Sequence, residues 1–559
     1  MGIRGRDREF RLPKITYLDF KHIEMDRVLT QLFPRLRYDG YASRRVRKKD
    51  IPVEEFVKEF LERPEWFEGF SVYPNIVARW IETDLLDIVN RGKPNQAVAS
   101  PRPLHGNIYK FRNARYCRDY FASEQIYWMI YYARQGRGQA VRDMLSSFFF
   151  TAIDLVTDQY DSRVAIDVET QALLRLDPQV EKDMRDSKQP GRYPPLCIGQ
   201  SDILADDILR LMAYRDYMPR SVLVDYLKTL LAFHLAIYHL RLLKLVPAFV
   251  QQRRGDPLCD LSRCPVAPAQ MQCQGDCPHR IGILVEMGDV NNSLMQELAQ
   301  KSADLHYRRI PTFVHAHYIL KKLDEMAEYL SSKVGKMSLP AAGFFSVPDL
   351  LQLLQPSNRP DLEAYFKVRL VSLVEDASSD AEIDPEIRQV SELGLDDFET
   401  YMEILMASRA KYHRQYITES LDSLLLKNRD SGLLAQSRRK PRRFVLGGRL
   451  LEVLLQIAVL TPNGSSFETR PLLIEDLLLF LKERYGLYID RLPDMDSPAL
   501  SSLPAHQALR LNTEAFKKRL REIGFFQDLS DAYITQMVTP RYTIRQNRAV
   551  LRSNPEVQQ

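Results

Sequence analysis

The sequence predicts a mainly α-helical protein built from several domains, and three observations lead to this prediction. The chain has 559 residues, more than a single hydrophobic core usually accommodates. Its composition, 45% hydrophobic and 27% charged, is typical of a folded chain rather than a disordered one. Between segments rich in proline and glycine, apolar residues recur mainly at the spacing of amphipathic helices.

Residues 1–100 are expected to form an α+β domain with a basic patch. Trp66 and Trp80 indicate a packed core, because large aromatic side chains contribute most when buried. The patch comprises Arg44, Arg45, Arg47, Lys48 and Lys49. Prolines at positions 101 and 103 follow, and two prolines in so short a stretch favour a domain boundary.

Residues 101–258 are predicted to form a helical domain. Its most apolar stretch, residues 221–250, contains Asp225, Lys228 and Arg241, so no uncharged window of about 18 residues is available to span a membrane. A buried helix is therefore expected there. Acidic residues interrupt the basic N-terminus and no apolar segment follows, unlike in a signal peptide. We therefore expect a cytoplasmic protein without membrane contact.

The segment 259–280 is rich in cysteine and resembles a zinc knuckle. Four cysteines fall within it, followed by a histidine: Cys259, Cys264, Cys273, Cys277 and His279. Closely spaced thiolates can wrap a tetrahedral Zn²⁺, with His279 able to replace one thiol. The spacing is not that of paired CxxC motifs, so disulfides and unliganded cysteines remain alternatives. A closed four-ligand site would be structural and would leave no position for catalysis.

A second helical domain is expected over residues 281–430, and a basic linker over residues 431–443. The linker carries Arg438, Arg439, Lys440, Arg442 and Arg443. Runs of this kind are usually solvated, and they contact phosphate only where the adjoining domain binds nucleic acid. The formal net charge of the whole chain is only +5. Any nucleic-acid binding must therefore depend on local patches.

Residues 444–547 are predicted to form a winged-helix-like domain. Apolar helices are expected at 449–460 and 472–485, and a third helix is expected to begin at Asn512-Thr513 and to end before Gly524. Strand-like segments follow around residues 525–526, 533–535 and 538–544. Three helices followed by a β ribbon is the order of a winged helix. The insertion at 490–507 is longer than a simple helix-turn-helix allows.

The predicted third helix is basic, which points to DNA as a ligand. It carries Lys517, Lys518, Arg519 and Arg521, and Arg541 and Arg545 lie in the predicted wing. Such side chains can contact phosphates or read guanine edges in the major groove. The alternative is a protein-docking module whose basic face is merely solvated.

No complete catalytic motif is found. Asp167 and Glu169 resemble the first motif of the RNase-H-like (DEDD) exonucleases, in which two carboxylates on a strand hold two metal ions. The distant carboxylates that such a site also requires do not occur at a suitable place. A pair of surface carboxylates is the alternative, and we expect a protein that is not an enzyme.

Three C-terminal segments resemble components of bacterial anti-phage gene clusters. They are GGRLLEVLLQIAVL, LLLFLKERYGLYIDRLP and AFKKRLREIGFFQDLSDAYITQMVTPRY. They are most similar to the methylation-associated defence system, with phosphorothioation-dependent restriction components as a second possibility. The resemblance implies protein partners from the same cluster, such as a methyltransferase, nuclease or ATPase, and a role in recognising or holding DNA. It carries over no catalytic residue.

The leading hypothesis is therefore a non-enzymatic, DNA-associated subunit of a defence or restriction complex that binds DNA through the winged helix. A protein-docking scaffold that recruits a partner nuclease or methyltransferase is the first alternative. A metal-dependent nuclease using Asp167 and Glu169 is the second.

Overall fold

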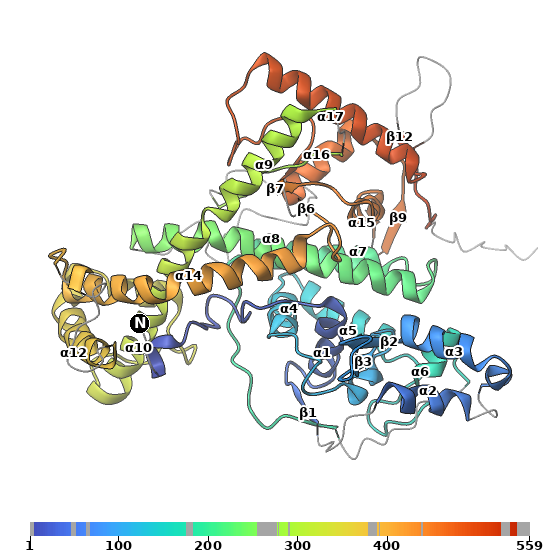
Figure 1. Ribbon diagram of the computed structural model, residues 1–559, viewed down its shortest axis with the longest axis horizontal. Helices are drawn as coiled ribbons and strands as arrows, with labels where there is room; N and C mark the ends of the chain where they lie inside the picture. The colour runs from blue at the N-terminus through green and yellow to red at the C-terminus, as the bar shows by residue number, and fades with distance from the viewer. Residues whose placement is uncertain are drawn as a thin grey trace, which may run out of the picture.

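The computed structural model describes residues 5–45, 52–62, 67–161, 163–174, 183–253, 277, 279–288, 291–377, 388–390, 392–437, 440–464, 466–526 and 537–544. The protein is mainly helical, with 57% helix and 9% strand, which confirms the predicted fold class at this level. Two long helices cross the middle of the molecule, and three groups of elements pack around them (Figure 1).

The central helices are α8 (Arg220–Gln252) and α14 (Asp397–Leu425), which contact each other along the molecule (Figure 1). α8 begins after Pro219 and ends at Arg253, whose φ of 52° is left-handed. α8 is long and apolar enough to cross a membrane by length and composition, but 94% of its most apolar window is buried inside the protein. As the sequence predicts, this helix is buried. It is apolar on all sides because other elements cover it all round.

The N-terminal lobe lies below the central helices in Figure 1 and mixes helices with short strands. Strand β2 (Leu86–Val89) pairs antiparallel with β3 (Ala97–Pro101), so the boundary expected at residue 100 falls inside a hairpin. A second pair joins β1 (Ser43–Arg45) to β4 (Asp183–Arg185). The other elements are α1 (Met25–Arg37), α2 (Val53–Leu61), η2 (Phe70–Val72), α3 (Pro74–Trp80), η3 (Ile81–Leu85), η4 (Gly106–Phe111), α4 (Ala122–Tyr131), α5 (Arg137–Phe149), α6 (Val168–Leu174) and α7 (Ile198–Met212).

A second lobe, at the left of Figure 1, follows α8 in the chain. Its helices α10 (Ile310–Tyr329) and α12 (Arg359–Ala377) both contact α14. The lobe also contains η7 (Leu330–Val334), α11 (Val347–Gln352) and η8 (Pro356–Asn358). α9 (Ser293–Tyr307) precedes this lobe in the chain and packs against the C-terminal module (Figure 1).

The N-terminal arm, which starts with η1 (Gly5–Arg8) and runs to residue 24, joins the two lobes. Asp7 is buried and contacts Lys322, Arg369 and Tyr401 of the second lobe. The ring of Phe10 stacks between the imidazoles of His317 and His413, with centroids 4.1 Å away on each side. Because these contacts are buried, they bind the arm firmly to the second lobe before the chain enters α1.

The C-terminal module lies above the central helices (Figure 1). Its helices are α15 (Gly448–Ala458), α16 (Ile474–Tyr485) and α17 (Leu503–Glu522). Its short strands pair as follows: β6 (Leu434–Ser437) with β7 (Lys440–Phe444), β8 (Leu460–Asn463) with β9 (Ser466–Thr469), and β10 (Leu472–Leu473) with β12 (Met537–Val538), all antiparallel, and β11 (Leu487–Tyr488) parallel with β5 (Ile283–Leu284).

Two of these pairings link distant parts of the chain. Val538 of β12 pairs with Leu472 on one side and bridges to Phe526 on the other, which gives the order β10, β12, Phe526 across three short strands. Residues 283–286 run parallel to β11, and Glu286 also bridges to Val445. The module is thus built partly from residues that precede it by more than 150 positions.

One cluster of buried apolar side chains extends from Leu12 to Ile544 among the described residues. A smaller cluster lies between α9 and the first half of α17, around Met295, Leu298 and Leu509. The segments expected as separate domains therefore share one core, because every lobe packs directly or through a neighbour on α8.

Candidate functional site

Helix α17 is the element on which the DNA hypothesis depends, and it begins earlier than expected. The Ser502 side chain caps it and Pro504 stands in its first turn, a common start signal. The predicted start at Asn512 is wrong. The buried Asn512 amide instead donates to the carbonyls of Val285 and Ile489, and it accepts a hydrogen bond from the amide of Met287. Asn512 therefore holds α17 against the parallel pair β5–β11.

Two of the five basic residues of α17, Lys517 and Arg519, pair with carboxylates of the same helix. Lys517 Nζ lies 3.0 Å from Glu514 Oε1, and Arg519 Nη1 lies 2.9 Å from Glu522 Oε2. Arg521 lies over the ring of Phe526. Lys518 is exposed and meets no carboxylate within ion-pair distance among the described residues. The two ion pairs therefore offset two of the five positive charges of α17.

Arg541 follows β12 and is also engaged. Its guanidinium donates to the carbonyl of Ile523 at 2.6 Å, and it lies 3.7 Å from Glu452 of α15. Arg545 lies outside the described residues.

The segment expected to be a basic linker forms the hairpin β6–β7 instead. Arg442 binds Asp422 of α14 through two nitrogens, at 2.6 and 3.0 Å. Arg443 donates to Glu286 at 2.7 Å. Lys440 begins β7, and Arg438 and Arg439 lie outside the described residues. The hairpin forms because two of its arginines find buried or half-buried carboxylates in other elements.

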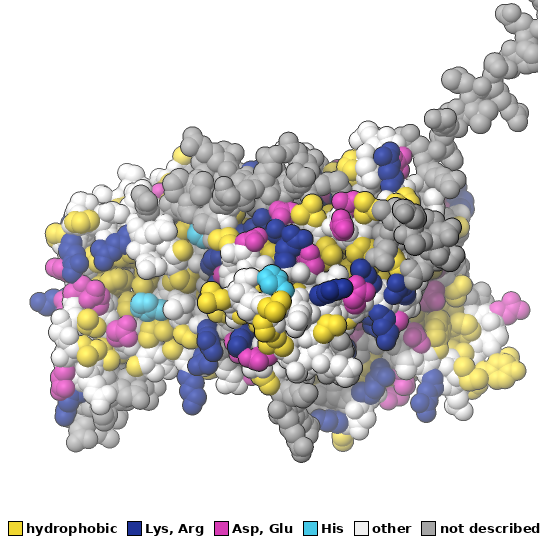
Figure 2. Space-filling view, turned by 90° about the horizontal axis from the view of Figure 1, so that it is seen from above, with side chains coloured by type: hydrophobic (Ala, Val, Ile, Leu, Met, Phe, Trp, Pro, Cys, Tyr) yellow, Lys and Arg dark blue, Asp and Glu magenta, His cyan; other side chains and the backbone are white. Residues whose placement is uncertain are grey.

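The C-terminal module as a whole carries no net charge. Residues 444–547 contain 12 Lys and Arg against 12 Asp and Glu. In the predicted wing, residues 527–536 contain two aspartates and no lysine or arginine, and Arg541 and Arg545 follow. Among the described residues on the upper face of the molecule, basic and acidic side chains are interspersed (Figure 2).

Large apolar side chains are exposed on the outer face of α17 and just before it. Leu500 is 90% exposed, Leu503 73% and Leu511 53%. Leu503 and Leu511 are eight residues apart and therefore share one face of the helix. The sequence interpretation missed them because it placed residues 490–507 in a loop. The helical spacing of Leu503 and Leu511 after the Ser502 cap was the available signal.

A buried charge cluster holds the module to α7, and His234 of α8 also contacts it. Arg484 of α16 contacts Asp206 and Asp207 of α7, and Tyr485 donates to Asp207 at 2.8 Å. Burial disfavours the charge of Asp207, but the Arg484 guanidinium and His234 lower the pKa of this carboxyl to about 2. The module is therefore anchored in one position by ionised groups that water does not reach.

Only two of the five predicted zinc ligands are described. Cys277 and His279 are both buried, and the ring of His279 packs edge-on against Phe249. Cys259, Cys264 and Cys273 lie outside the described residues. Within the described part of the chain, no group of three or more His, Cys, Asp or Glu side chains could hold a metal ion.

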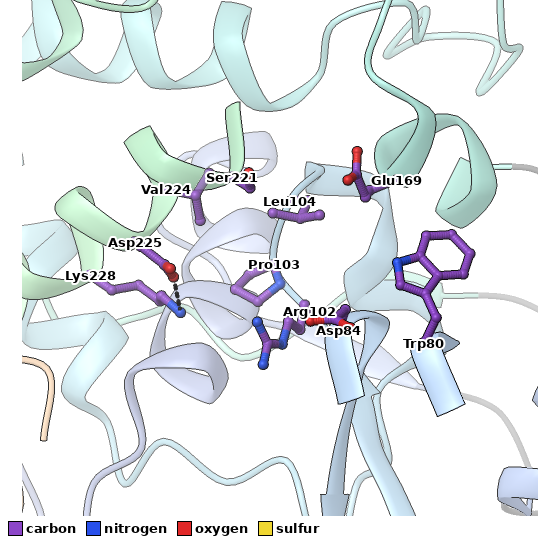
Figure 3. Close-up of a pocket in the computed structure, with 10 residues that line it drawn as sticks. All are labelled: Trp80, Asp84, Arg102, Pro103, Leu104, Glu169, Ser221, Val224, Asp225 and Lys228. Atoms are coloured by element: carbon purple, nitrogen blue, oxygen red, sulfur yellow. Dashed lines mark ion pairs between the residues drawn. The ribbon is translucent and has the colours of Figure 1, made fainter. Parts of the chain in front are cut away.

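Asp167 and Glu169 do not lie on a strand. Asp167 directly precedes α6, where its carboxylate accepts hydrogen bonds from the amide and hydroxyl of Thr170, as a helix cap does. Glu169 lines a pocket of about 330 Å³ with Trp80, Arg102 and the ion pair Asp225–Lys228 (Figure 3). The strand geometry of the exonuclease motif is therefore not present at these residues.

A family model described as "Methylation-associated defense system protein MAD7" matches residues 5–542. A search of the curated proteins finds no match.

Proposed function

The chain belongs to this family of methylation-associated defence system proteins, and on this basis we propose that it acts as a non-catalytic docking component of the defence system. In this role it binds protein partners of the same system through its C-terminal module. The family match covers nearly the whole chain, which supports a role within the defence assembly rather than a role of one isolated domain.

The arrangement of the C-terminal module supports a winged helix. Its elements follow the order α15, β10, α16, α17, the Phe526 bridge and β12. β12 pairs with β10 on one side and with Phe526 on the other. Three helices, with β12 paired to β10 and bridged to Phe526, fit the winged-helix arrangement expected from the sequence. Winged helices bind either nucleic acid or protein, so the choice between these two ligands is argued from the surface of α17.

The observation that carries the docking proposal is the pairing of charges on α17. Binding to DNA gains most of its affinity from cations that neutralise phosphates, but Lys517 and Arg519 already pair with Glu514 and Glu522. A nucleic-acid-binding domain is usually strongly basic, whereas residues 444–547 are neutral. Exposed leucines on the same helix instead fit a protein interface, whose centre is depleted of charge.

Co-purification from cells that express the complete defence gene cluster tests this proposal. We expect the double variant Leu503→Glu, Leu511→Glu to lose its protein partners. Leu339, which is 56% exposed in a loop of the second lobe, supplies the matched control Leu339→Glu and should retain them. Retention of every partner by the double variant would show that α17 is not the docking element.

DNA contact is the second candidate function. It is favoured by Arg510, Lys518 and Arg521, which are all on the exposed side of α17. If DNA is the ligand, duplex binding measured by fluorescence anisotropy should weaken steeply with salt. It should also be lost when Lys517, Lys518, Arg519 and Arg521 are all replaced by Glu. Under the docking proposal, the four replacements leave any duplex binding by the wild-type protein unchanged.

A structural zinc ion is proposed for Cys259, Cys264, Cys273 and Cys277, with His279 as a possible replacement for one thiol. The burial of Cys277 and His279 supports this proposal, since structural zinc ligands are shielded from water and stabilise the fold directly. We expect one zinc per chain by elemental analysis and a loss of metal in Cys277→Ser. A metal-free wild-type protein with unchanged stability in chelator would exclude the site.

A further inference from the structure

A groove of about 750 Å³ lies beside the second half of α17. One wall is α17 itself, from Leu511 to Glu522. The opposite wall is formed by the start of α15 and by the hairpin β6–β7, and Glu286, Met287, Gly288 and Asn291 also line the groove. The groove is a product of the tertiary fold, since its walls come from three separate parts of the chain.

The carboxylates in this groove are already neutralised. Glu286 pairs with Arg443, Glu514 with Lys517, and Glu522 with Arg519, all at 3.0 Å or less. Two further lysines that line the groove, Lys427 and Lys518, are exposed and have no ion-pair partner among the described residues. The groove therefore presents an excess of positive charge. The amino end of α15, which no side chain caps, adds to the positive potential.

The groove is also continuous with the exposed apolar face of α17. Leu511 lines it, and Leu503 lies on the same face of the helix about 12 Å away, at 1.5 Å per residue. Lys518 lies about 10 Å from Leu511 in the other direction. Ala515, Ala435 and Val445 contribute further apolar surface to the walls. Along its length the site therefore changes from apolar to positively charged.

We propose that this groove binds an acidic segment of a protein partner, with apolar side chains seated against Leu503 and Leu511 and carboxylates at Lys427 and Lys518. The inference rests on the proposed docking function and names the chemistry of the partner. A basic segment would meet two unpaired lysines with like charge, which costs affinity. A nucleic acid carries phosphate along its whole length and would place charge beside the exposed leucines Leu503 and Leu511.

The experiment uses the complex purified from cells that express the whole defence gene cluster. A carbodiimide joins a lysine amine to a carboxylate only where the two are in contact, and mass spectrometry maps the joined residues. We expect Lys518 or Lys427 to be coupled to an Asp or Glu of a partner. Lys518→Arg keeps the charge but cannot be coupled in this way, so it should retain the partner and lose that cross-link.

Affinity measurements give a second, independent reading. The double variant Lys427→Glu, Lys518→Glu should bind the partner about tenfold more weakly, since each exposed ion pair contributes up to about 1 kcal/mol. Lys333→Glu, at an exposed lysine of the second lobe, is the matched control. Ala515→Trp, which fills the groove without changing charge, should also weaken binding.

The outcomes separate the two proposals. A complex that needs Leu503 and Leu511, but shows no coupling at either lysine and no effect of the lysine replacements, overturns the acidic partner and leaves the docking function in place. A complex that ignores the leucine and lysine replacements alike overturns both.

Discussion

Replacement of Arg484 by methionine tests whether the buried charge cluster holds the C-terminal module in place. Arg484 Nε donates to Asp207 Oδ1 at 2.9 Å, and Nη2 contacts Asp206 Oδ2 at 2.6 Å. The side chain of Arg484 is 2% exposed and that of Asp207 is fully buried. Removal of the guanidinium leaves a carboxylate in a place that water does not reach.

The expected loss of stability depends on which partners Asp206 and Asp207 keep after Arg484 is replaced. Breaking a buried ion pair on one side usually costs about 3–5 kcal/mol. Asp207 keeps its hydrogen bonds from Tyr485 and His234, and Asp206 keeps Arg210. We therefore expect the lower end of this range, about 3 kcal/mol, in the free energy that holds α16 on α7. At 1.4 kcal/mol per factor of ten, this is roughly a 100-fold increase in opening.

Hydrogen exchange measured by mass spectrometry reports this opening locally. We expect the amides of α16 and α7 to exchange about 100-fold faster in Arg484→Met. Arg491→Met is the control, because Arg491 pairs with Asp490 at the surface and is 55% exposed, so it should cost less than about 1 kcal/mol.

Removal of the unpaired Asp207 charge provides a further check. In Arg484→Met the added replacement Asp207→Asn should restore part of the protection, because it removes the uncompensated carboxylate. Equal exchange in Arg484→Met and Arg491→Met would refute the argument that the buried charges anchor the module.

Three other predictions concern the fold as a whole. Burial lowers the pKa of five histidines, to about 4 for three of them and to about 3 for two: His105, His239, His306, His317 and His413. Between pH 6.5 and 4 only the unfolded chain takes up these protons, so each histidine lowers the free energy of unfolding by about 1.4 kcal/mol for every unit by which the pH falls. The Tm should therefore fall steeply below pH 6. A constant Tm down to pH 5 would contradict this prediction. Both amide atoms of Gln456 are buried without a partner among the described residues, so Gln456→Met should raise the free energy of unfolding by about 1 kcal/mol in a urea titration, whereas a clear loss would mean that the amide is satisfied. A Cβ on Gly486, which has a φ of 73°, would lie 2.1 Å from the carbonyl oxygen of Ile281. Gly486→Ala should therefore destabilise the protein by about 3 kcal/mol or more, measured by thermal unfolding. The control is Gly464→Ala, at a φ of 61° with open space around it, which should cost only the backbone strain of about 1–2 kcal/mol.

Several elements could be predicted from local sequence, and the reasons are local. A buried helix was expected at α8 because residues 221–250 are the most apolar stretch of the chain, and the charges within this stretch excluded a membrane span. Helical spacing predicts Phe516, Leu520 and Ile523 as inward positions; Phe516 and Leu520 are fully buried, and Ile523 is half-buried. The start of α17 was missed because Ser502 and Asn512 are both plausible caps. Only the hydrogen bonds of Asn512 to Val285 and Ile489 distinguish them.

The sequence by itself determined the helical class, the buried central helix and the membership of a defence-system family, because each of these depends on patterns within a contiguous stretch. The tertiary structure alone decided which positive charges are free. Arg443 meets Glu286 157 positions away, and Arg484 meets Asp207 277 positions away, and no periodicity encodes such partners. A basic segment has the same composition whether its charges face water or a carboxylate. What α17 can bind therefore followed only from where the chain brings its carboxylates.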